Sequence, residues 1–306
     1  MLVDSFGRRI TYLRLSVTDK CNLRCRYCLP HPLKIGREEI LSFEEIIRIV
    51  KLLTEIGIKK VRLTGGEPLV RKGIEKLIES IHPYVEELVL TTNGVLLANF
   101  IHKIKKYIKR INVSLDTLSE KKFFEITGGG NIRSVLDGIF KSKEEGIHIK
   151  INTVVLKGVN ENEMIDIFNF AKENEIEVRF IEPITDTENF IHISEIKNRF
   201  FSELQINGNF EAKGLEGVQE TYIISGVRVG FIAALSCGFC SSCNRIRLTS
   251  DGRIKLCLRD SVEFDIKNII RSTKDDEEIK NYITNQMKLK PEKGKQNTIF
   301  MRGIGG

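Results

Sequence analysis

Residues 13–28 read LRLSVTDKCNLRCRYC, and the fold follows from this stretch. Its first part, residues 13–18, is rich in β-branched and apolar residues and predicts a strand. Three cysteines follow directly, at Cys21, Cys25 and Cys28. We therefore expect a sulfur-rich loop at the carboxyl end of a strand, which is where α/β sheets and barrels place their active sites.

The same kind of strand recurs through the first two thirds of the chain. Short runs of β-branched or apolar residues predict strands at 60–64, 87–92, 110–116, 149–155 and 177–182. Between them, apolar residues recur at helical spacing in 42–56, 72–81, 95–107, 132–145 and 161–174. This alternation predicts a parallel sheet with right-handed crossovers. Six units are two short of a closed barrel, so we predict an α/β fold with a partial (β/α)6 TIM-like barrel, and a doubly wound sheet as second choice.

A different pattern begins near residue 210. Two pairs of short strands flank turn residues, the first pair around Gly226 and the second around Asp251 and Gly252. The strands are predicted at 221–225, 227–233, 245–249 and 253–257, and helices at about 263–270 and 275–289. We expect two units, a barrel over 1–210 and a C-terminal cluster-binding extension over 211–306.

The composition is that of a globular protein. Of 306 residues, 41% are hydrophobic and 29% are charged, which excludes a collagen-like or wholly disordered chain. No apolar run reaches about 18 residues and the first residues lack an apolar core, so neither a membrane helix nor a signal peptide is predicted. The net charge of +7 permits an anionic ligand and demands no nucleic acid. Because no secretion signal is predicted, we expect a cytoplasmic protein. In that reducing compartment, closely spaced cysteines more often bind metal or do redox chemistry than form structural disulfides.

The first cysteine group has the spacing of a metal centre. Thiolates favour zinc or iron–sulfur clusters. A four-iron cluster needs one ligand for each iron, so Cys21, Cys25 and Cys28 would leave one iron open for a small molecule. Zinc is the alternative, with His31 as a possible fourth ligand, but prolines flank that histidine on both sides.

The second cysteine group consists of Cys240, Cys243 and Cys257. The predicted hairpin between Cys243 and Cys257 would bring the three thiols together around a second cluster. Spacing alone equally allows a structural zinc site, with Cys237 as the fourth thiolate. Both alternatives stay open on this pattern.

The motifs together resemble the radical S-adenosylmethionine (SAM) superfamily. Tyr27 directly precedes the last cysteine of the first group, and the superfamily's glycine-rich motif occurs as GGEP at 65–68, at the end of the second strand. The segment 239–252, FCSSCNRIRLTSDG, followed by Cys257, resembles the GTP 3′,8-cyclase family within that superfamily. The resemblance extends over essentially the whole chain, through 13–19, 91–94, 111–116, 179–182 and the terminal Gly305 and Gly306.

This resemblance implies a lyase that carries out the first step of molybdenum cofactor biosynthesis. It implies two [4Fe-4S] clusters, the first binding SAM and the second binding the guanine of GTP. Reductive cleavage of SAM would yield a radical that takes hydrogen from C3′ of GTP, after which C3′ would attack C8 of guanine. The product would be (8S)-3′,8-cyclo-7,8-dihydroguanosine 5′-triphosphate, and no side chain is expected to act as a catalytic acid or base.

The resemblance also assigns residues to each ligand. The two clusters are assigned to the two cysteine groups, Cys21, Cys25 and Cys28, and Cys240, Cys243 and Cys257. SAM is assigned to Tyr27, Gly66, Ser114 and Ile184. GTP is assigned to Arg14, Arg62, Thr91, Lys150, Arg245 and Arg247.

The charge pattern supports the GTP assignment. Arg14, Arg62 and Lys150 lie within predicted strands, where a buried unpaired charge is costly. GTP carries about four negative charges and needs fixed cationic donors, so a barrel interior that holds it removes this cost. Lys60 and Arg179 are weaker candidates of the same kind.

The resemblance implies partners as well. They are an electron donor and a downstream cyclic pyranopterin monophosphate synthase, and the chain is expected as a monomer or homodimer that binds no nucleic acid or membrane. The sequence departs from the family pattern at three places. Ile184 stands where the family often has Met, Leu29 replaces a frequent Met, and Cys237 is extra.

Two other functions remain as alternatives. One is a different radical SAM enzyme with an auxiliary cluster, such as a peptide-modifying maturase, although those usually carry more cysteines in the C-terminal extension. The other is a zinc-stabilised, mildly basic RNA-binding or regulatory protein. That alternative explains neither the GGEP motif nor the six strand–helix units.

The first testable prediction concerns the extra cysteine. We expect Cys237→Ser to keep iron content and turnover near wild-type values, because a fourth thiolate would occupy the iron that guanine needs. Iron counting and product formation by the variant check this. Loss of the second cluster in Cys237→Ser would contradict the assignment of Cys240, Cys243 and Cys257 as the complete ligand set.

Overall fold

The computed structural model describes residues 1–28, 40–184, 188–204, 210–216, 219–236 and 239–295. Its centre is a sheet in which six strands pair in parallel and in chain order. These strands are β1 (Tyr12–Ser16), β2 (Lys60–Thr64), β3 (Glu87–Thr92), β4 (Arg110–Ser114), β5 (His148–Val154) and β6 (Glu177–Ile181). The six predicted strands are confirmed, with small shifts at their ends.

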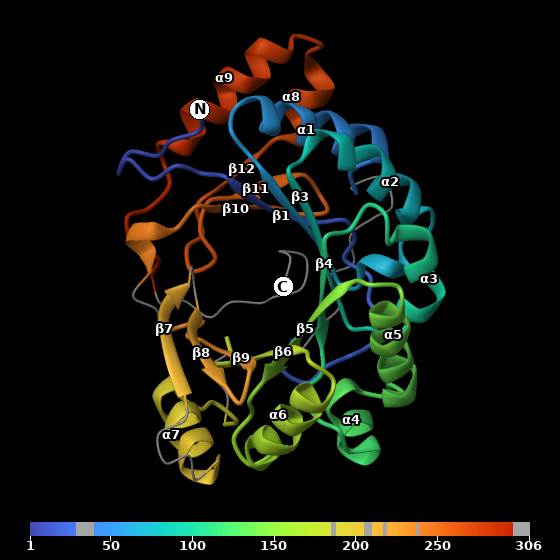
Figure 1. Cartoon of the computed structure of the whole chain (residues 1–306). Helices are drawn as coiled ribbons and strands as arrows, with labels where there is room; N and C mark the ends of the chain where they lie inside the picture. The colour runs from blue at the N-terminus through green and yellow to red at the C-terminus, as the bar shows by residue number, and fades with distance from the viewer. Residues whose placement is uncertain (29–39, 185–187, 205–209, 217–218, 237–238, 296–306) are drawn as a thin grey trace.

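Helices connect the strands and cover the outside of the curved sheet (Figure 1). They are α1 (Phe43–Glu55), α2 (Ile74–Ile81), α3 (Leu97–Ile104), α4 (Glu120–Thr127), α5 (Ile132–Glu144), α6 (Met164–Glu173) and α7 (Ile193–Leu204). The start of α1 follows from a capping box, in which Ser42 Oγ accepts a hydrogen bond from the backbone N–H of Glu45 and the Glu45 carboxylate accepts one from Ser42 N–H. Helices α4 and α7 were not predicted.

The C-terminal part adds one parallel strand to each edge of this sheet. Strand β9 (Val227–Ile232) pairs with β6, and β10 (Arg245–Leu248) pairs with β1. Antiparallel strands extend both edges further. Beyond β9 lie β8 (Gln219–Ile224) and then β7 (Phe210–Glu216). Beyond β10 lie β11 (Arg253–Lys255) and then β12 (Glu263–Asp265). The sheet therefore runs β12-β11-β10-β1-β2-β3-β4-β5-β6-β9-β8-β7, which is the predicted partial barrel with both edges extended.

One expectation for the C-terminal part needs correction, and one strand there was not predicted. Both predicted hairpins are present, as β8–β9 and β10–β11. The helix expected at 263–270 is instead strand β12 followed by the short helix α8 (Lys267–Ser272), because 263–265 pair with β11. Strand β7 was missed, whereas α9 (Asp276–Met287) lies within the predicted 275–289. The division into units near residue 210 stays a prediction.

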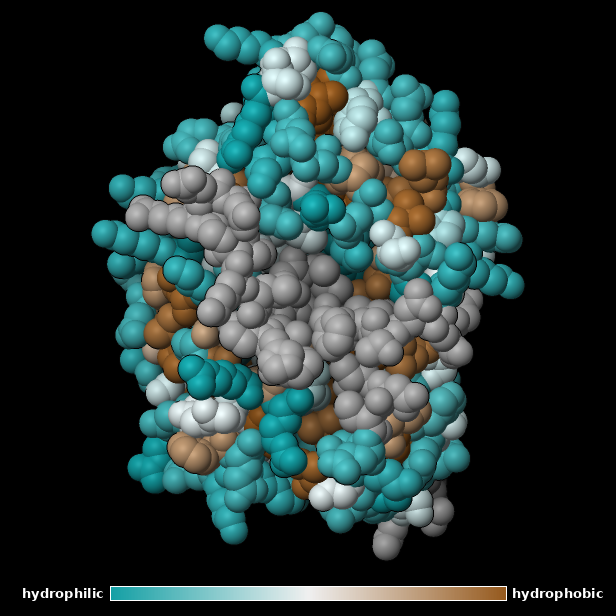
Figure 2. All heavy atoms as spheres, turned by 180° about the vertical axis from the view of Figure 1, so that it is seen from behind, coloured by the Kyte–Doolittle hydropathy of each residue, from teal (hydrophilic) through white to brown (hydrophobic). Residues whose placement is uncertain are grey.

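The two faces of the central strands differ in chemistry. Leu13, Leu15 and Leu63 are fully buried in the apolar core shared with the helices. Arg14 and Arg62 alternate with them and so face the barrel interior. The outer surface seen in Figure 2 is mainly hydrophilic, with apolar residues in small separate groups. Among the residues described, no helix combines the length and apolarity needed to cross a bilayer.

Candidate active site

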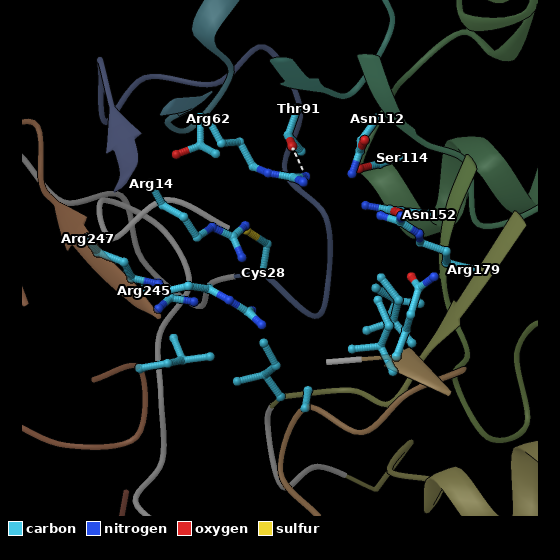
Figure 3. A pocket seen from close by; sticks show the side chains of 18 of the residues that line it. Arg14, Cys28, Arg62, Thr91, Asn112, Ser114, Asn152, Arg179, Arg245 and Arg247 are labelled. Carbon is cyan, nitrogen blue, oxygen red and sulfur yellow. Dashed lines mark hydrogen bonds between the residues drawn. The ribbon is translucent and has the colours of Figure 1, made fainter. Parts of the chain in front are cut away.

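A cavity of about 620 Å³ lies inside the barrel. All residues assigned to ligands from the sequence line it, namely Arg14, Cys21, Cys25, Tyr27, Cys28, Arg62, Gly66, Thr91, Ser114, Lys150, Ile184, Cys240, Cys243, Arg245, Arg247 and Cys257. Figure 3 shows how Arg14, Arg245 and Arg247 enter from one side and Arg179 from the opposite side. The fold thus brings both cysteine groups to the walls of one chamber. Cys237, Leu29, His31 and the terminal glycines lie outside the described residues.

The glycines of the GGEP motif fix the start of the first cysteine loop. Gly66 N–H donates to the carbonyl oxygen of Thr18 at 2.7 Å, and the next N–H, from Glu67, donates to that of Lys20 at 2.8 Å. A Cβ on Gly66 would collide with the Lys20 carbonyl, and one on Gly65 would lie 2.7 Å from the Thr18 oxygen. Only glycine allows the two backbone segments to approach this closely.

Glu67 anchors the same motif from inside. Its carboxylate is 1% exposed and accepts hydrogen bonds from Leu69 N–H, Thr92 Oγ1 and Asn93 N–H. Burial raises the pKa of Glu67 to about 7, although these three donors favour the charged form. Glu67 therefore joins the end of β2 to the end of β3 below the first cysteine group. Glu67 was recognised only as part of the GGEP motif, and this anchoring role was not predicted.

Tyr27 is held by a second buried carboxylate. Its hydroxyl donates to Asp116 Oδ2 at 2.6 Å, and Asp116 Oδ1 accepts from Val154 N–H at 2.8 Å. Burial raises the pKa of Asp116 to about 6. Asp116 thus ties the cysteine loop to the carboxyl ends of β4 and β5.

The thiols of the first group lie in surroundings that disfavour free thiolates. Burial raises the pKa of Cys25, and the negative charges of Asp116, Cys28 and Cys21 raise it further. A cationic centre bound by all three thiolates would offset this repulsion. Within the described part of the chain, no three His, Cys, Asp or Glu side chains converge as ligands of a single metal ion. Three thiolates could each bind one iron of a four-iron cluster.

The second cysteine group is surrounded by cations that the sequence did not single out. Arg259 Nη2 donates to Cys240 Sγ at 3.2 Å. Lys290 is 2% exposed, and its ammonium donates to the carbonyl oxygens of Arg245 and Leu256. Burial would raise the pKa of Cys243, but the charge of Lys290 contributes most to lowering it overall. These contacts favour thiolates, which are the form that binds a metal centre.

Three arginines form a row across the interior. Arg14 pairs in register with Arg247 on one side and with Arg62 on the other. The Nε atoms of Arg14 and Arg247 are buried and have no hydrogen-bond partner in the part of the chain that the structure describes. Burial and neighbouring arginines lower the pKa of Arg14 strongly and that of Arg247 to about 10. So much buried positive charge calls for an anionic ligand.

Lys150 lies on the far side of the chamber and is paired in the ligand-free protein. Its ammonium contacts Glu177, whose other oxygen accepts from Arg179 at 2.8 Å. Burial, followed by the charge of Arg179, lowers the pKa of Lys150 to about 8. The single carboxylate of Glu177 therefore pairs with both Lys150 and Arg179, so this side of the chamber also keeps a net positive charge.

Tyr12 is a further lining residue that the sequence did not single out. It pairs in register with Arg245 and Lys60, and its hydroxyl accepts a hydrogen bond from Arg62 Nε. The cationic groups of Lys60, Arg62 and Arg245 lie 5.2, 5.7 and 5.9 Å from the ring centroid. Burial would raise the pKa of Tyr12, but the surrounding charges, with Arg62 first, lower it to about 8.

Comparison with known proteins identifies the family. The family model "Radical SAM superfamily" matches residues 15–171, and the model "Molybdenum Cofactor Synthesis C" matches residues 162–296. A GTP 3′,8-cyclase of Clostridium perfringens (strain 13 / Type A) is 42% identical over 99% of each chain. One of Peptoclostridium acidaminophilum is 40% identical over 100% of this chain and 98% of its own.

The chain belongs to the GTP 3′,8-cyclase family.

Solved structures agree with the fold of this GTP 3′,8-cyclase family member. Streptococcus suis SuiB bound to S-adenosylmethionine gives a TM-score of 0.62 at 18% identity, over 94% of this chain and 71% of that chain. Native anSMEcpe with bound AdoMet gives 0.57 at 18% identity, over 88% and 82%. At this identity the likeness concerns the fold, and it confirms the partial barrel of the radical SAM type.

A testable prediction follows from the charges around Tyr12. We expect one phenol of this family member to titrate near pH 8 in the ligand-free protein, and Tyr12→Phe to remove that step. Folding lowers the pKa of Tyr12 below its unfolded value of about 10, so the phenolate form stabilises the folded protein. This stabilisation is fully present above pH 10 and is lost as the pH falls through 8. Phenolate absorbance and thermal unfolding across this range check both effects. Titration of every tyrosine near pH 10 would contradict the prediction.

Proposed function

We propose that this chain is a GTP 3′,8-cyclase, a radical SAM lyase that converts GTP to (8S)-3′,8-cyclo-7,8-dihydroguanosine 5′-triphosphate. One observation carries the proposal. Two groups of three cysteines and a set of buried cations line the same cavity of about 620 Å³. That volume lies within the usual range for small-molecule sites. The reaction is the first step of molybdenum cofactor biosynthesis.

The two cysteine groups hold the cofactors. Cys21, Cys25 and Cys28 would bind one [4Fe-4S] cluster, and Cys240, Cys243 and Cys257 the other. When bound, the clusters and SAM supply one-electron reduction and hydrogen abstraction, which amino-acid side chains do not provide. The chain itself contributes binding, orientation and exclusion of water.

SAM binding falls to the residues around the first cysteine group. Tyr27 is fixed by its hydrogen bond to Asp116, and Gly66 by the backbone bonds of the GGEP motif. Ser114 and Ile184 line the same cavity, so the hydroxyl can contact a ribose and the aliphatic side chain an adenine. The Met-to-Ile change at 184 keeps an apolar surface there.

GTP binding falls to the cationic residues. Arg14, Arg62 and Arg247 form one row across three neighbouring strands, and a triphosphate would neutralise that row. Arg62 also donates to Thr91 Oγ1 at 3.0 Å, which fixes its guanidinium in the chamber. Arg245 and Lys150 complete the assigned set, and the guanine would face the second cysteine group. Lys60 and Arg179 line the cavity as well.

The remaining expectations are proposals of the same kind. The enzyme acts in the cytoplasm, takes electrons from a separate donor and passes its product to a cyclic pyranopterin monophosphate synthase. It works as a monomer or homodimer and binds no nucleic acid. Residues 1–210 carry the first cluster, and 211–306 carry the second cluster and the Gly305–Gly306 tail.

The experiment is anaerobic reconstitution followed by product analysis with GTP and SAM. We expect two [4Fe-4S] clusters and a cyclised product with a new carbon–carbon bond. Cys28→Ser and Cys240→Ser should each lose about half of the iron and all of the product, because each removes one of only three ligands.

Substitution of an exposed residue, Asn281→Ser, is the control and should keep both iron and product. A nucleotide fraction without the carbon–carbon bond would overturn the proposed function. Zinc in place of iron at the second site would overturn the cofactor assignment.

A further inference from the structure

Asn112 is a buried residue in the centre of β4 whose side-chain amide has no hydrogen-bond partner among the described residues. The residue is 0% exposed, yet it lines the chamber. Neither its Nδ2 nor its Oδ1 forms a hydrogen bond within the described protein. An unpaired buried amide costs free energy, and buried polar groups are normally satisfied. Asn112 is therefore built for a partner that binds in the chamber.

A structural asparagine looks different in this protein. Asn160 is 1% exposed, and all of its polar groups are used. Its Nδ2 donates to the carbonyl oxygens of Asp116 and Val154, and its Oδ1 accepts from Leu156 N–H. Such an asparagine supports the backbone, whereas Asn112 has no comparable task. Apolar residues would serve better at a strand position that only filled space.

The sheet register places Asn112 between the two proposed ligands. Asn112 pairs with Thr91 on β3 and with Lys150 on β5, so it lies at the level of two residues assigned to GTP. Ser114, two residues further on the same face, is assigned to SAM. Figure 3 shows Asn112 beside Ser114, with its amide end directed into the chamber. This is the level at which the two ligands would meet.

The chemistry of the amide selects the part of the ligand that it binds. An amide presents one donor and one acceptor side by side. Phosphate oxygens only accept, and would leave Oδ1 unpaired. A pair of neighbouring hydroxyl groups can accept from Nδ2 and donate to Oδ1 at the same time. The guanine would lie toward the second cysteine group, of which Cys240 and Cys243 come just before β10, a strand four places from β4 in the sheet order.

We propose that Asn112 binds the ribose 2′- and 3′-hydroxyls of the nucleotide substrate and thereby positions the sugar carbon that loses its hydrogen. This inference rests on the proposed function. Asn112 is a positioning and specificity residue for ribonucleotides over 2′-deoxyribonucleotides, and no proton or electron passes through it.

The test compares GTP with 2′-deoxy-GTP on the anaerobically reconstituted protein. We expect the wild type to bind GTP at least about tenfold more tightly than the deoxy analogue. Asn112→Leu, which keeps the size but removes both polar atoms, should weaken GTP binding by roughly 10- to 100-fold and make the two affinities nearly equal. SAM affinity and iron content should stay unchanged.

Stability of the ligand-free protein gives a second readout. Because Asn112→Leu removes two unpaired polar atoms, its melting temperature without nucleotide should equal or exceed that of the wild type. A structural asparagine would give the opposite sign. Asn112→Ser, which is smaller, should also lose the preference for GTP and decides the matter if the leucine variant fails to fold. Asn281→Leu on the exposed face of α9 is the matched control.

The outcomes distinguish failure of the role of Asn112 from failure of the proposed function. Unchanged discrimination between GTP and 2′-deoxy-GTP in the Asn112 variants would overturn this inference while the proposed function stands. So would a large loss of SAM binding or of melting temperature in both variants. A wild type that makes no cyclised product from GTP would overturn the proposed function, and this inference with it.

Discussion

The interior of this barrel is organised around buried positive charge. Arg14, Arg62 and Arg247 meet in register across three strands, and among the described residues the buried Nε atoms of Arg14 and Arg247 have no hydrogen-bond partner. Such a row cannot be a packed apolar core, so the stability of the protein must come from the layer between strands and helices. There, leucine and isoleucine side chains are fully buried. The chamber is preformed for an anion at a cost in ligand-free stability.

The C-terminal part completes the chamber rather than forming a separate lobe beside it. Strand β10 brings two arginines next to β1, and its pairing sets the second cysteine group against the open side of the barrel. Arg8 holds this arrangement from the N-terminal segment, because its guanidinium donates to the carbonyl oxygens of Cys240, Pro291 and Glu292. The N-terminal segment and the residues around Pro291 thus meet at the loop that begins with Cys240.

Much of this could be predicted from local sequence. The strands at 60–64 and 87–92 agree with β2 and β3, because their β-branched runs are bounded by clear turn and helix signals. Strand β12 could not be predicted, because residues 263–265 become a strand only by pairing with β11. Helix α4 was missed although its two ends carry ordinary helix signals, a capping serine at Ser119 and a left-handed glycine at Gly128.

The residues of the candidate site likewise fall into those that local sequence could predict and those that depend on long-range contacts. Cysteines and arginines in motifs were predictable, since their chemistry is carried by residue type and spacing. Asp116 lies at the end of the segment 111–116, but its partner Tyr27 is 89 residues away in the sequence. Tyr12 and Asn112 depend on strand register, which decides the neighbours that each side chain meets. Roles that arise from such long-range contacts could not be derived from local patterns.

The central claim is that the chamber is shaped and charged for a nucleoside triphosphate. The most direct measurement is the melting temperature of the reconstituted protein with GTP and with guanosine at equal concentration. At about 100 times its dissociation constant, GTP should stabilise the protein by about 2.7 kcal/mol and raise the melting temperature by roughly 4 °C. Guanosine should give a much smaller rise, and added salt should narrow the difference. Equal shifts with both ligands would contradict the account.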